Sequence, residues 1–211
     1  GKVLLPISGI PIVVLAAKRA ANTGHQVLVV TSKEDSDITL TRALEANGID
    51  FFCGSLNNTL NRFVEALKDY DSETLVFRLT ADNIFPDGVF LDEIKSNFLE
   101  RGLEYISCNN ENSGLPYGVS VELTRLKYLR DSENRSLDAY DREHVTPYIR
   151  RMFPDSNFTK YKYLGKEAYR CTIDYIEDYE LVSKVFLKVS DPVKEPTLSL
   201  VEKLTMTKSV D

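Results

Sequence analysis

The sequence lacks the features that mark nucleic-acid-binding and membrane-spanning proteins. Its 211 residues carry a formal net charge of −6 and contain no run of lysines and arginines. A nucleic-acid backbone is bound mainly by clustered positive charge, so we expect no nucleic-acid partner, although a few local cations would suffice to hold a small anion. The longest apolar run, residues 12–17, is far too short to cross a bilayer, so we expect no membrane span.

Cysteine pairs and common catalytic motifs are also missing. The three cysteines, Cys53, Cys108 and Cys171, lie far apart and form no CxxC pair. We therefore expect reduced thiols in the core of a cytoplasmic protein rather than a disulfide framework or a metal site. The sequence contains no GxGxxG loop, Walker loop, nucleophile elbow or HExxH helix. None of these motifs therefore assigns a reaction to the chain.

The stretch 74–86, TLVFRLTADNIFP, has the pattern of a buried strand that ends in a carboxylate. Leu75, Val76, Phe77 and Leu79 form a nearly continuous apolar run, as expected of a strand covered on both faces of a parallel sheet. Asp82 follows, at the position where open α/β sheets bind their ligands. The same carboxylate would also suit a structural role, in which it holds the turn by hydrogen bonds to nearby backbone.

The first half of the chain alternates between strand and helix patterns. Further strands are predicted at residues 25–31, 49–53 and 105–108, with helices at about 11–23, 37–47, 59–70 and 88–102. This alternation with short turns predicts a single α/β domain over residues 1–211, with a doubly wound, mostly parallel sheet. Such a fold should open on a strand, so we expect the first strand to be missing from the given sequence, which then begins inside a loop.

The second half is less regular. Strands are predicted at residues 119–123, 158–163 and 168–173, and helices at about 176–189 and 198–206. The polar stretch 109–117 carries Gly and Pro and predicts an exposed loop. Asp174 follows the last predicted strand and precedes a helix, which repeats the setting of Asp82.

Two carboxylates at the ends of strands in one sheet would face each other across a single crevice. Such a pair binds Mg²⁺ at nucleotide sites, together with water and phosphate oxygens. It also serves as acid and base in sugar hydrolysis, so the pair alone does not select a reaction. For Asp174 by itself, an N-cap of the following helix is the simpler alternative.

For three further residues the sequence allows either a chemical or a structural role. Lys2 is the cation of the opening loop and Arg62 lies on the first turn of its helix, so each could contact a phosphate or carry a solvated surface charge. His144 could carry a proton near neutral pH, or it could be held structurally beside Arg142 and Glu143. The pattern leaves these alternatives open.

Five segments resemble the motifs of one known family. They are residues 1–6 (the tail of a loop R-x-x-S-x-R-L-P-G-K-V-L-L-P), 54–62 (G-S-x-x-D-V-L-D-R), 80–83 (where the family has T-G-D-C-P), 141–148 (D-R-E-H-V-T-P-Y, residue for residue) and 172–178 (W-T-V-D-T-P-E-D). By these segments the chain resembles the spore-coat polysaccharide biosynthesis cytidylyltransferases, relatives of the CMP-sugar synthetases that activate octulosonate and sialic-type acids. The chain departs from the family pattern at Asn58, Asn61, Ala81, Asn83 and Ser120.

The resemblance implies a nucleotide-diphospho-sugar transferase (GT-A-like) fold and a Mg²⁺-dependent nucleotidyltransferase. CTP, or another NTP, and a sugar or sugar acid would give an NMP-sugar and pyrophosphate, for cell-surface or spore-coat polysaccharide. The residue roles that it implies are Asp82 and Asp174 as metal ligands; Lys2, Asp82 and Asp174 as catalytic residues; Lys2, Ser55, Asn58, Arg62, Ala81 and Asp82 in nucleotide binding; and Tyr117, Arg142, Glu143 and His144 in sugar binding. It also allows a homodimer. The alternatives are a nucleotide-sugar-dependent glycosyltransferase and a degenerate member that binds without catalysing.

Overall fold

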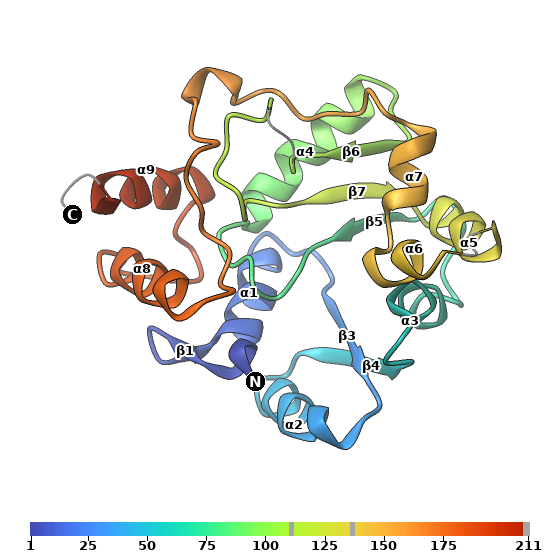
Figure 1. The fold of residues 1–211 in the computed structure, drawn as a ribbon, viewed down its shortest axis with the longest axis horizontal. Coiled ribbons are helices and arrows are strands. Elements are labelled where there is room, and N and C mark those ends of the chain that lie inside the picture. Colours follow the sequence, from blue (N-terminus) through green and yellow to red (C-terminus); the bar gives the residue numbers. More distant parts are fainter. Residues whose placement is uncertain (110–111, 136–137, 209–211) are drawn as a thin grey trace.

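The structure is a computed structural model that describes residues 1–109, 112–135 and 138–208, and all structural statements refer to these residues (Figure 1). Its helices are α1 (Ile12–Ala20), α2 (Ile38–Ala46), α3 (Thr59–Ala66), α4 (Gly88–Glu100), α5 (Leu126–Arg135), α6 (Ala139–His144), α7 (Pro147–Met152), α8 (Ile176–Phe186) and α9 (Thr197–Lys208). Its strands are β1 (Pro6–Ile7), β2 (Ile10–Pro11), β3 (Leu28–Ser32), β4 (Asp50–Gly54), β5 (Leu75–Arg78), β6 (Tyr105–Ser107) and β7 (Glu122–Arg125). Short 3-10 helices cover Lys2–Leu4, Asp35–Asp37 and Lys162–Leu164. None of the described helices has the length and apolar character needed to cross a membrane.

The described strands form a parallel pair, an antiparallel group of three and a small hairpin (Figure 1). β3 runs parallel to β4. β7 lies between β5 and β6 and is antiparallel to both, so β5 and β6 run in the same direction. The order β3, α2, β4, α3, β5, α4, β6 along the chain confirms the predicted α/β class. The reversed strand β7 is a feature that the alternation does not indicate.

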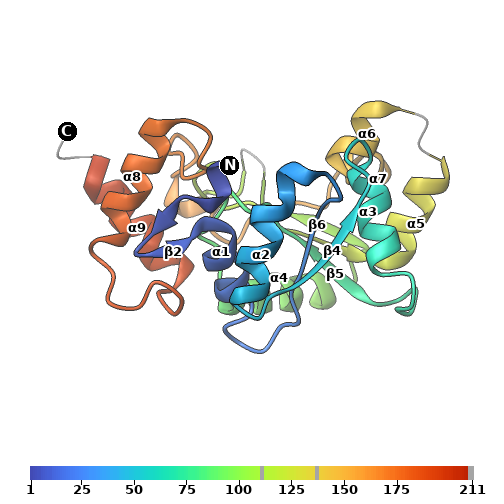
Figure 2. The same cartoon turned by 90° about the horizontal axis from the view of Figure 1, so that it is seen from below.

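The sheet around β5 is covered on both faces. Val76 of β5 and Tyr105 of β6 belong to a buried cluster with residues of α3, α5 and α7. Their neighbours Phe77 and Ile106 belong to, or pack against, a larger cluster with residues of α1, α4, α8 and α9. Because successive side chains of a strand point to opposite faces, the two clusters mark the two faces of the sheet. Figure 2 shows α8 and α9 at one end of the molecule and α3, α5, α6 and α7 at the other.

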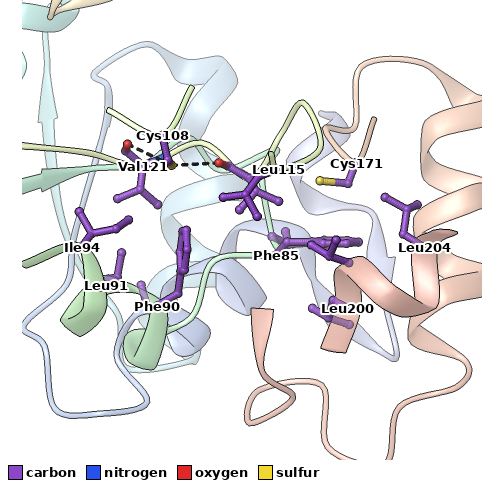
Figure 3. Close-up of a cluster of buried hydrophobic side chains, with 14 of the residues drawn as sticks. Phe85, Phe90, Leu91, Ile94, Cys108, Leu115, Val121, Cys171, Leu200 and Leu204 are labelled. Carbon is purple, nitrogen blue, oxygen red and sulfur yellow. Dashed lines mark hydrogen bonds between the residues drawn. The ribbon is translucent and has the colours of Figure 1, made fainter. Parts of the chain in front are cut away.

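Two of the three cysteines lie in the larger cluster. Cys108 and Cys171 are buried there, in the cluster that also holds Phe90 of α4 and Leu200 of α9 (Figure 3). Burial raises the pKa of the Cys108 thiol to about 12 and also raises that of Cys171, so both thiols stay protonated at neutral pH. Cys53 is exposed, so the prediction of a core position is wrong for this residue. It lies on β4, which pairs with β3 alone among the described strands and is largely open to solvent.

The strands predicted at residues 158–163 and 168–173 are wrong. In the described structure these regions make one isolated bridge each, between Asn157 and Ser107 and between Arg170 and Tyr117. The first bridge is made to the last residue of β6 and the second to the irregular stretch that follows β6, and neither extends into a continuous ladder. A Cβ at Gly118 would overlap the backbone of Thr172, and this close approach keeps the two stretches side by side.

The stretch 109–117 also differs from the prediction of an exposed loop. Residues 113–116 are buried, and 110–111 lie outside the described residues. Gly114 lies so close to the carbonyl of Tyr161 that a side chain there would overlap it, so the middle of the loop packs on the protein, while residues 109, 112 and 117 are exposed as predicted.

The other predicted elements are found with moderate shifts at their ends. The strand expected at 119–123 lies at Glu122–Arg125, and the helix expected at 59–70 ends at Ala66. The opening segment, expected to be a loop, forms the 3-10 helix Lys2–Leu4 and the hairpin of β1 and β2 before α1 begins.

Candidate functional site

Lys2, Asp82 and Asp174 meet at one point, although they come from three distant parts of the chain. Asp82 lies in the turn after β5 and Asp174 just ahead of α8. The Nζ atom of Lys2 donates hydrogen bonds to Asp82 Oδ2 at 2.9 Å and to Asp174 Oδ1 at 2.7 Å. The backbone N–H of Ile173 donates to the carbonyl oxygen of Asp82 at 3.1 Å, which ties the two aspartate segments together. The two carboxylates thus converge on a single cation.

Other residues perform the structural roles that were weighed for these aspartates. The turn after β5 is held by Asn83, whose backbone N–H and side-chain amide both donate to Thr80. The carboxylate of Asp178 accepts hydrogen bonds from the backbone N–H groups of Asp174 at 2.9 Å and Tyr175 at 3.0 Å, and so caps α8. The carboxylates of Asp82 and Asp174 are therefore directed at side chains instead of the local backbone.

The charges at this point are mutually stabilising. The hydrogen bond from Lys2 has the largest effect on Asp174 and lowers its pKa. Burial opposes this shift, and Arg170, which donates to the same carboxylate at 2.5 Å, lowers the pKa further. Burial disfavours the charged form of Lys2, but the hydrogen bonds to Asp174 and Asp82 outweigh it and raise the pKa of the ammonium group. The carboxylate of Asp174 and the ammonium group of Lys2 are therefore charged together at neutral pH.

These residues fit a divalent cation that also binds phosphate. The described residues contain no group of three or more His, Cys, Asp and Glu that could hold a metal ion. Two carboxylates that converge on one cation are, however, the protein share of the usual Mg²⁺ site, in which water and substrate phosphates supply the other oxygens. The side chains of Asp82 and Asp174 are 24% and 38% exposed, so a ligand can reach them.

Asp82 and Asp174 border a polar pocket of about 380 Å³. Arg78 and Arg150 line it as well, and both donate to the buried carboxylate of Glu122, at 2.6 and 2.7 Å. Arg78 lies directly opposite Glu122 in the pairing of β5 with β7. The pocket therefore has an acidic side at the two aspartates and a basic side at the two arginines.

The carboxylate of Glu122 is fully engaged within the protein. In addition to the two arginines, it accepts hydrogen bonds from the hydroxyls of Tyr105 and, at 2.8 Å, Thr146. Burial favours the neutral form of Glu122, but Arg78 and Arg150 outweigh burial and hold its pKa below the usual range. Two guanidinium groups thus share one negative charge, which leaves a net positive charge beside the pocket.

An unusual turn at Val145 shapes the wall of this pocket. Its φ of 72° and ψ of −52°, with a hydrogen bond of 2.8 Å from the N–H of Thr146 to the carbonyl of His144, define a γ-turn. A β-branched residue in this conformation is strained by about 1–3 kcal/mol. The fully buried side chain of Val145 holds it there, with His144 at the pocket on one side of the turn and Thr146 on Glu122 at the other.

The residues predicted to bind the sugar divide into two groups. Tyr117 and His144 line the pocket. The ring of Tyr117 lies under the guanidinium group of Arg170, at 5.3 Å from its centroid. Arg142 and Glu143 are exposed on α6 and are not part of the pocket lining.

Most of the residues predicted to bind the nucleotide are not part of this pocket's described lining. Of that set, Ser55, Asn58, Arg62 and Ala81 are not part of the described lining of the pocket that holds Asp82 and Asp174. Asn58 caps α3 by accepting from the N–H of Asn61 at 3.0 Å, and Arg62 donates to Thr59 at 2.6 Å. Ala81 packs on the apolar cluster around α1 and α2. Their roles in nucleotide binding stay predictions.

The arginines and the glutamate of the basic side were missed from the sequence, although a signal was present. Arg78 interrupts the apolar run 75–79 and Glu122 lies within the alternating stretch that forms β7. A charged residue in a strand that is covered on both faces requires a partner of opposite charge. The two could therefore have been paired with each other, but Arg150 carries no comparable signal.

A comparison with known protein families shows which family the chain belongs to. The model of the cytidylyltransferase family matches residues 1–206. The chain belongs to this family. The spore-coat resemblance is also confirmed, because the spore coat polysaccharide biosynthesis protein SpsF of Bacillus subtilis (strain 168) is 28% identical over 217 aligned positions, which cover 98% of this chain and 87% of SpsF.

A second curated relative is similar over a shorter region. An uncharacterized protein of Methanocaldococcus jannaschii is 30% identical over 161 residues, which cover 74% of this cytidylyltransferase and 63% of the relative. The match thus spans less than two thirds of the length of that protein.

Solved structures show the same fold. A cytidylyltransferase from Leptospira borgpetersenii superposes with a TM-score of 0.88 at 25% identity, over 100% of this chain and 89% of that one. The CMP:2-keto-3-deoxy-manno-octonic acid synthetase complexed with CTP superposes with a TM-score of 0.63 at 15% identity, over 89% and 92% of the two chains. The fold is therefore the nucleotide-sugar transferase fold of the cytidylyltransferases, as the resemblance implied.

Proposed function

We propose that this protein transfers a cytidylyl group from CTP to a sugar, with release of pyrophosphate, for the synthesis of a cell-surface polysaccharide. The observation that carries the proposal is the convergence of Asp82 and Asp174 on one cation at a polar pocket, in a chain of the cytidylyltransferase family. The name of SpsF supports a role in polysaccharide synthesis, and the CTP complex of a protein with the same fold supports the choice of nucleotide.

In this reaction the sugar hydroxyl attacks the α-phosphorus of CTP, a new oxygen–phosphorus bond forms, and the bond to the β-phosphate oxygen breaks as pyrophosphate leaves. Asp82 and Asp174 would hold Mg²⁺, which supplies neutralisation of the charge that develops on the leaving group. The ammonium group of Lys2, which lies beside both carboxylates, would bind phosphate oxygens at the same place. The pocket orients the sugar toward this point.

The basic side of the pocket favours a sugar acid as the acceptor. Arg78 and Arg150 share the single charge of Glu122, so one positive charge is left for a ligand. Charge-assisted hydrogen bonds between a guanidinium group and a carboxylate are among the strong ones, so an acidic sugar would bind more tightly than a neutral one. Tyr117 and His144 would contact the sugar from the same pocket.

The test is a measurement of pyrophosphate release with CTP, Mg²⁺ and a panel of matched acidic and neutral sugars. We expect release with CTP but not with ATP, GTP or UTP, with acidic sugars preferred, and we expect a chelator to stop it. Release of a nucleoside diphosphate from a nucleotide sugar would instead identify a glycosyltransferase. CTP binding by calorimetry, without turnover of any sugar in the panel, would identify a member that binds without catalysing.

A further inference from the structure

The two aspartates of the site differ in how firmly the protein holds them. Arg170 donates a hydrogen bond of 2.5 Å to Asp174 Oδ2, and Lys2 donates one of 2.7 Å to Oδ1 of the same carboxylate. Among the described residues, the side chain of Asp82 accepts a hydrogen bond from Lys2 alone. Asp174 therefore has one oxygen on each of two cations, whereas Asp82 has only the lysine that both aspartates share.

The guanidinium group of Arg170 is fixed from several directions. Its Nε and Nη2 groups donate to the two carboxylate oxygens of Asp178, at 3.0 and 3.2 Å. It also lies against the rings of Tyr117 and Tyr175, at 5.3 and 5.8 Å from their centroids. A planar guanidinium group is pre-organised for several hydrogen bonds at once, unlike an ammonium group on a flexible stem. Arg170 is thus the more rigid of the two cations that hold Asp174.

Tyr117 connects Arg170 to the polar pocket. Its side chain lines the pocket, and its backbone forms a parallel bridge with Arg170. The N–H of Tyr117 donates to the carbonyl of Tyr169 at 2.9 Å, and the N–H of Cys171 donates to the carbonyl of Tyr117 at 2.8 Å. These bonds fix the backbone on either side of Arg170, so the ring and the guanidinium group are held in contact. The pocket is therefore joined to Asp174 through one ring and one guanidinium group.

We propose that Arg170 is a positioning residue, which holds Oδ2 of Asp174 so that Oδ1 faces the cation shared with Asp82. Tyr117 keeps the guanidinium group in place from the side of the pocket. The use of this arrangement in catalysis rests on the proposed function: Asp174 would be oriented before the metal ion binds, and Asp82 would adjust to the ion. Loss of a partner that orients a metal-binding side chain typically lowers metal affinity about 10–100-fold.

Two other roles of Arg170 predict different results. As a purely structural residue it would only hold Asp178 at the start of α8, so its loss would lower the melting temperature and leave metal affinity unchanged. As a mere positive charge it would repel a divalent ion, so its loss would tighten metal binding. A positioning role predicts weaker binding even though a positive charge has been removed. The sign of the change in affinity therefore separates the three roles.

The test measures the binding of Mn²⁺ alone, without nucleotide or sugar, from the paramagnetic broadening of backbone amide signals. Broadening around residue 174 that is lost in Asp174→Asn locates the ion at the aspartates. Arg170→Gln should bind Mn²⁺ about 10–100 times more weakly than the wild type. Arg170→Lys keeps the charge without the fork, so its affinity should lie between the two. Lys184→Gln, which removes an exposed charge at the opposite end of α8, should bind Mn²⁺ as the wild type does.

Variants of Tyr117 test the connection to the pocket with the same measurement. Tyr117→Leu removes the aromatic face from Arg170 and should weaken Mn²⁺ binding about two- to fivefold. Tyr117→Phe keeps that face, so its Mn²⁺ affinity should stay close to that of the wild type. In the Arg170→Gln background the change to Leu should have no further effect, because the ring acts through the arginine.

The outcomes for Arg170 and for the proposed function can be told apart. Equal or tighter Mn²⁺ binding by Arg170→Gln would overturn the positioning role, and so would a wild type that binds no Mn²⁺ at the aspartates. If Arg170→Gln does not fold, wild-type affinity in both Arg170→Lys and Tyr117→Leu would overturn it instead. Pyrophosphate release tests the reaction separately: weaker Mn²⁺ binding by Arg170→Gln, beside a wild type that releases no pyrophosphate, would refute the proposed function and support the positioning of Asp174.

Discussion

Glu122 borders the same pocket as the pair Asp82 and Asp174, but the carboxylates differ in how many hydrogen bonds they accept from the protein. Glu122 is 3% exposed and accepts hydrogen bonds from four side chains. Asp82 and Asp174 are partly exposed and share one flexible ammonium group from Lys2. The first arrangement is closed and orients arginines, whereas the second leaves room for an incoming ligand.

The difference separates a carboxylate that stabilises the fold from carboxylates that are available to a ligand. A buried carboxylate with several charged donors is costly to disturb, because each donor would lose its partner in a place that water does not reach. A partly exposed carboxylate contributes little to stability, but it can bind a cation and substrate oxygens. We therefore expect substitutions at the aspartates to affect turnover and substitutions at Glu122 to affect stability.

The largest effect is expected for Asp82→Asn. If Asp82 holds a metal ion in the reaction, its loss removes several kcal/mol of transition-state stabilisation, and turnover should fall roughly a thousandfold or more. The free energy of unfolding should fall by only about 1 kcal/mol, because Asn keeps the size of the Asp side chain and most of its hydrogen bonding. Pyrophosphate release and thermal melts on the same preparation measure both quantities.

Asp174→Asn is the matched control for this prediction. It should behave like Asp82→Asn, and the double variant should be little slower than either single one, because both residues would serve one ion. Near-normal turnover in either single variant would contradict the assignment, whatever its melting temperature.

A smaller effect, on stability, is expected for Glu122→Gln. Removal of one partner of a buried ion pair costs about 3–5 kcal/mol, and here the neutral side chain leaves Arg78 and Arg150 without their shared charge. Denaturant unfolding should show a loss near the lower end of this range, because Gln still accepts hydrogen bonds. Glu104→Gln, which removes a charge paired with Arg125 near the surface, should cost less than about 1 kcal/mol. Equal losses in the two variants would remove the distinction between the groups.

The smallest effect is the acid dependence of stability that comes from Asp174. Its pKa is lowered in the folded protein by Lys2 and Arg170, so its contribution to stability is present above the unfolded value of about 4 and is lost as the pH falls through the folded pKa. The stability difference between wild type and Asp174→Asn should therefore shrink on going from pH 7 to pH 3 in urea titrations. A difference that stays constant over this range would show that the carboxylate charge does not matter. Added salt should also reduce it, because the side chain is partly exposed.

Local patterns predicted most of the fold, and they failed where structure depends on distant partners. The helices at 59–66, 88–100 and 176–186 follow apolar stripes with local capping signals, and all were predicted. The stretches 158–163 and 168–173 have strand-like composition, but a strand also needs a neighbour with which to form a ladder. The chain at the start of the first stretch bridges only the last residue of β6, the second stretch meets an irregular loop, and no local pattern reveals either contact.

The candidate site was predicted in part for the same reason. Asp82 and Asp174 each stand at the end of an apolar run, and that local signal made them candidates, but their role as metal ligands was predicted only through the resemblance to the cytidylyltransferases. Arg78 and Glu122 meet through the pairing of β5 with β7, 44 residues apart, and the reversed direction of β7 was not predicted. Arg150 reaches Glu122 from α7, a contact that depends on the strained turn at Val145 and on packing.

The position of Lys2 has a consequence for the order of events at the aspartates. Its ammonium group lies within 2.9 Å of both carboxylates, so a divalent ion bound to the same two oxygens would have to take its place. The lysine thus acts as a tethered counter-ion that holds the two carboxylates together. The arrival of such an ion would also release the lysine, on a side chain long enough to follow phosphates bound with the ion. Metal binding and capture of the phosphates by Lys2 would then be two halves of one exchange.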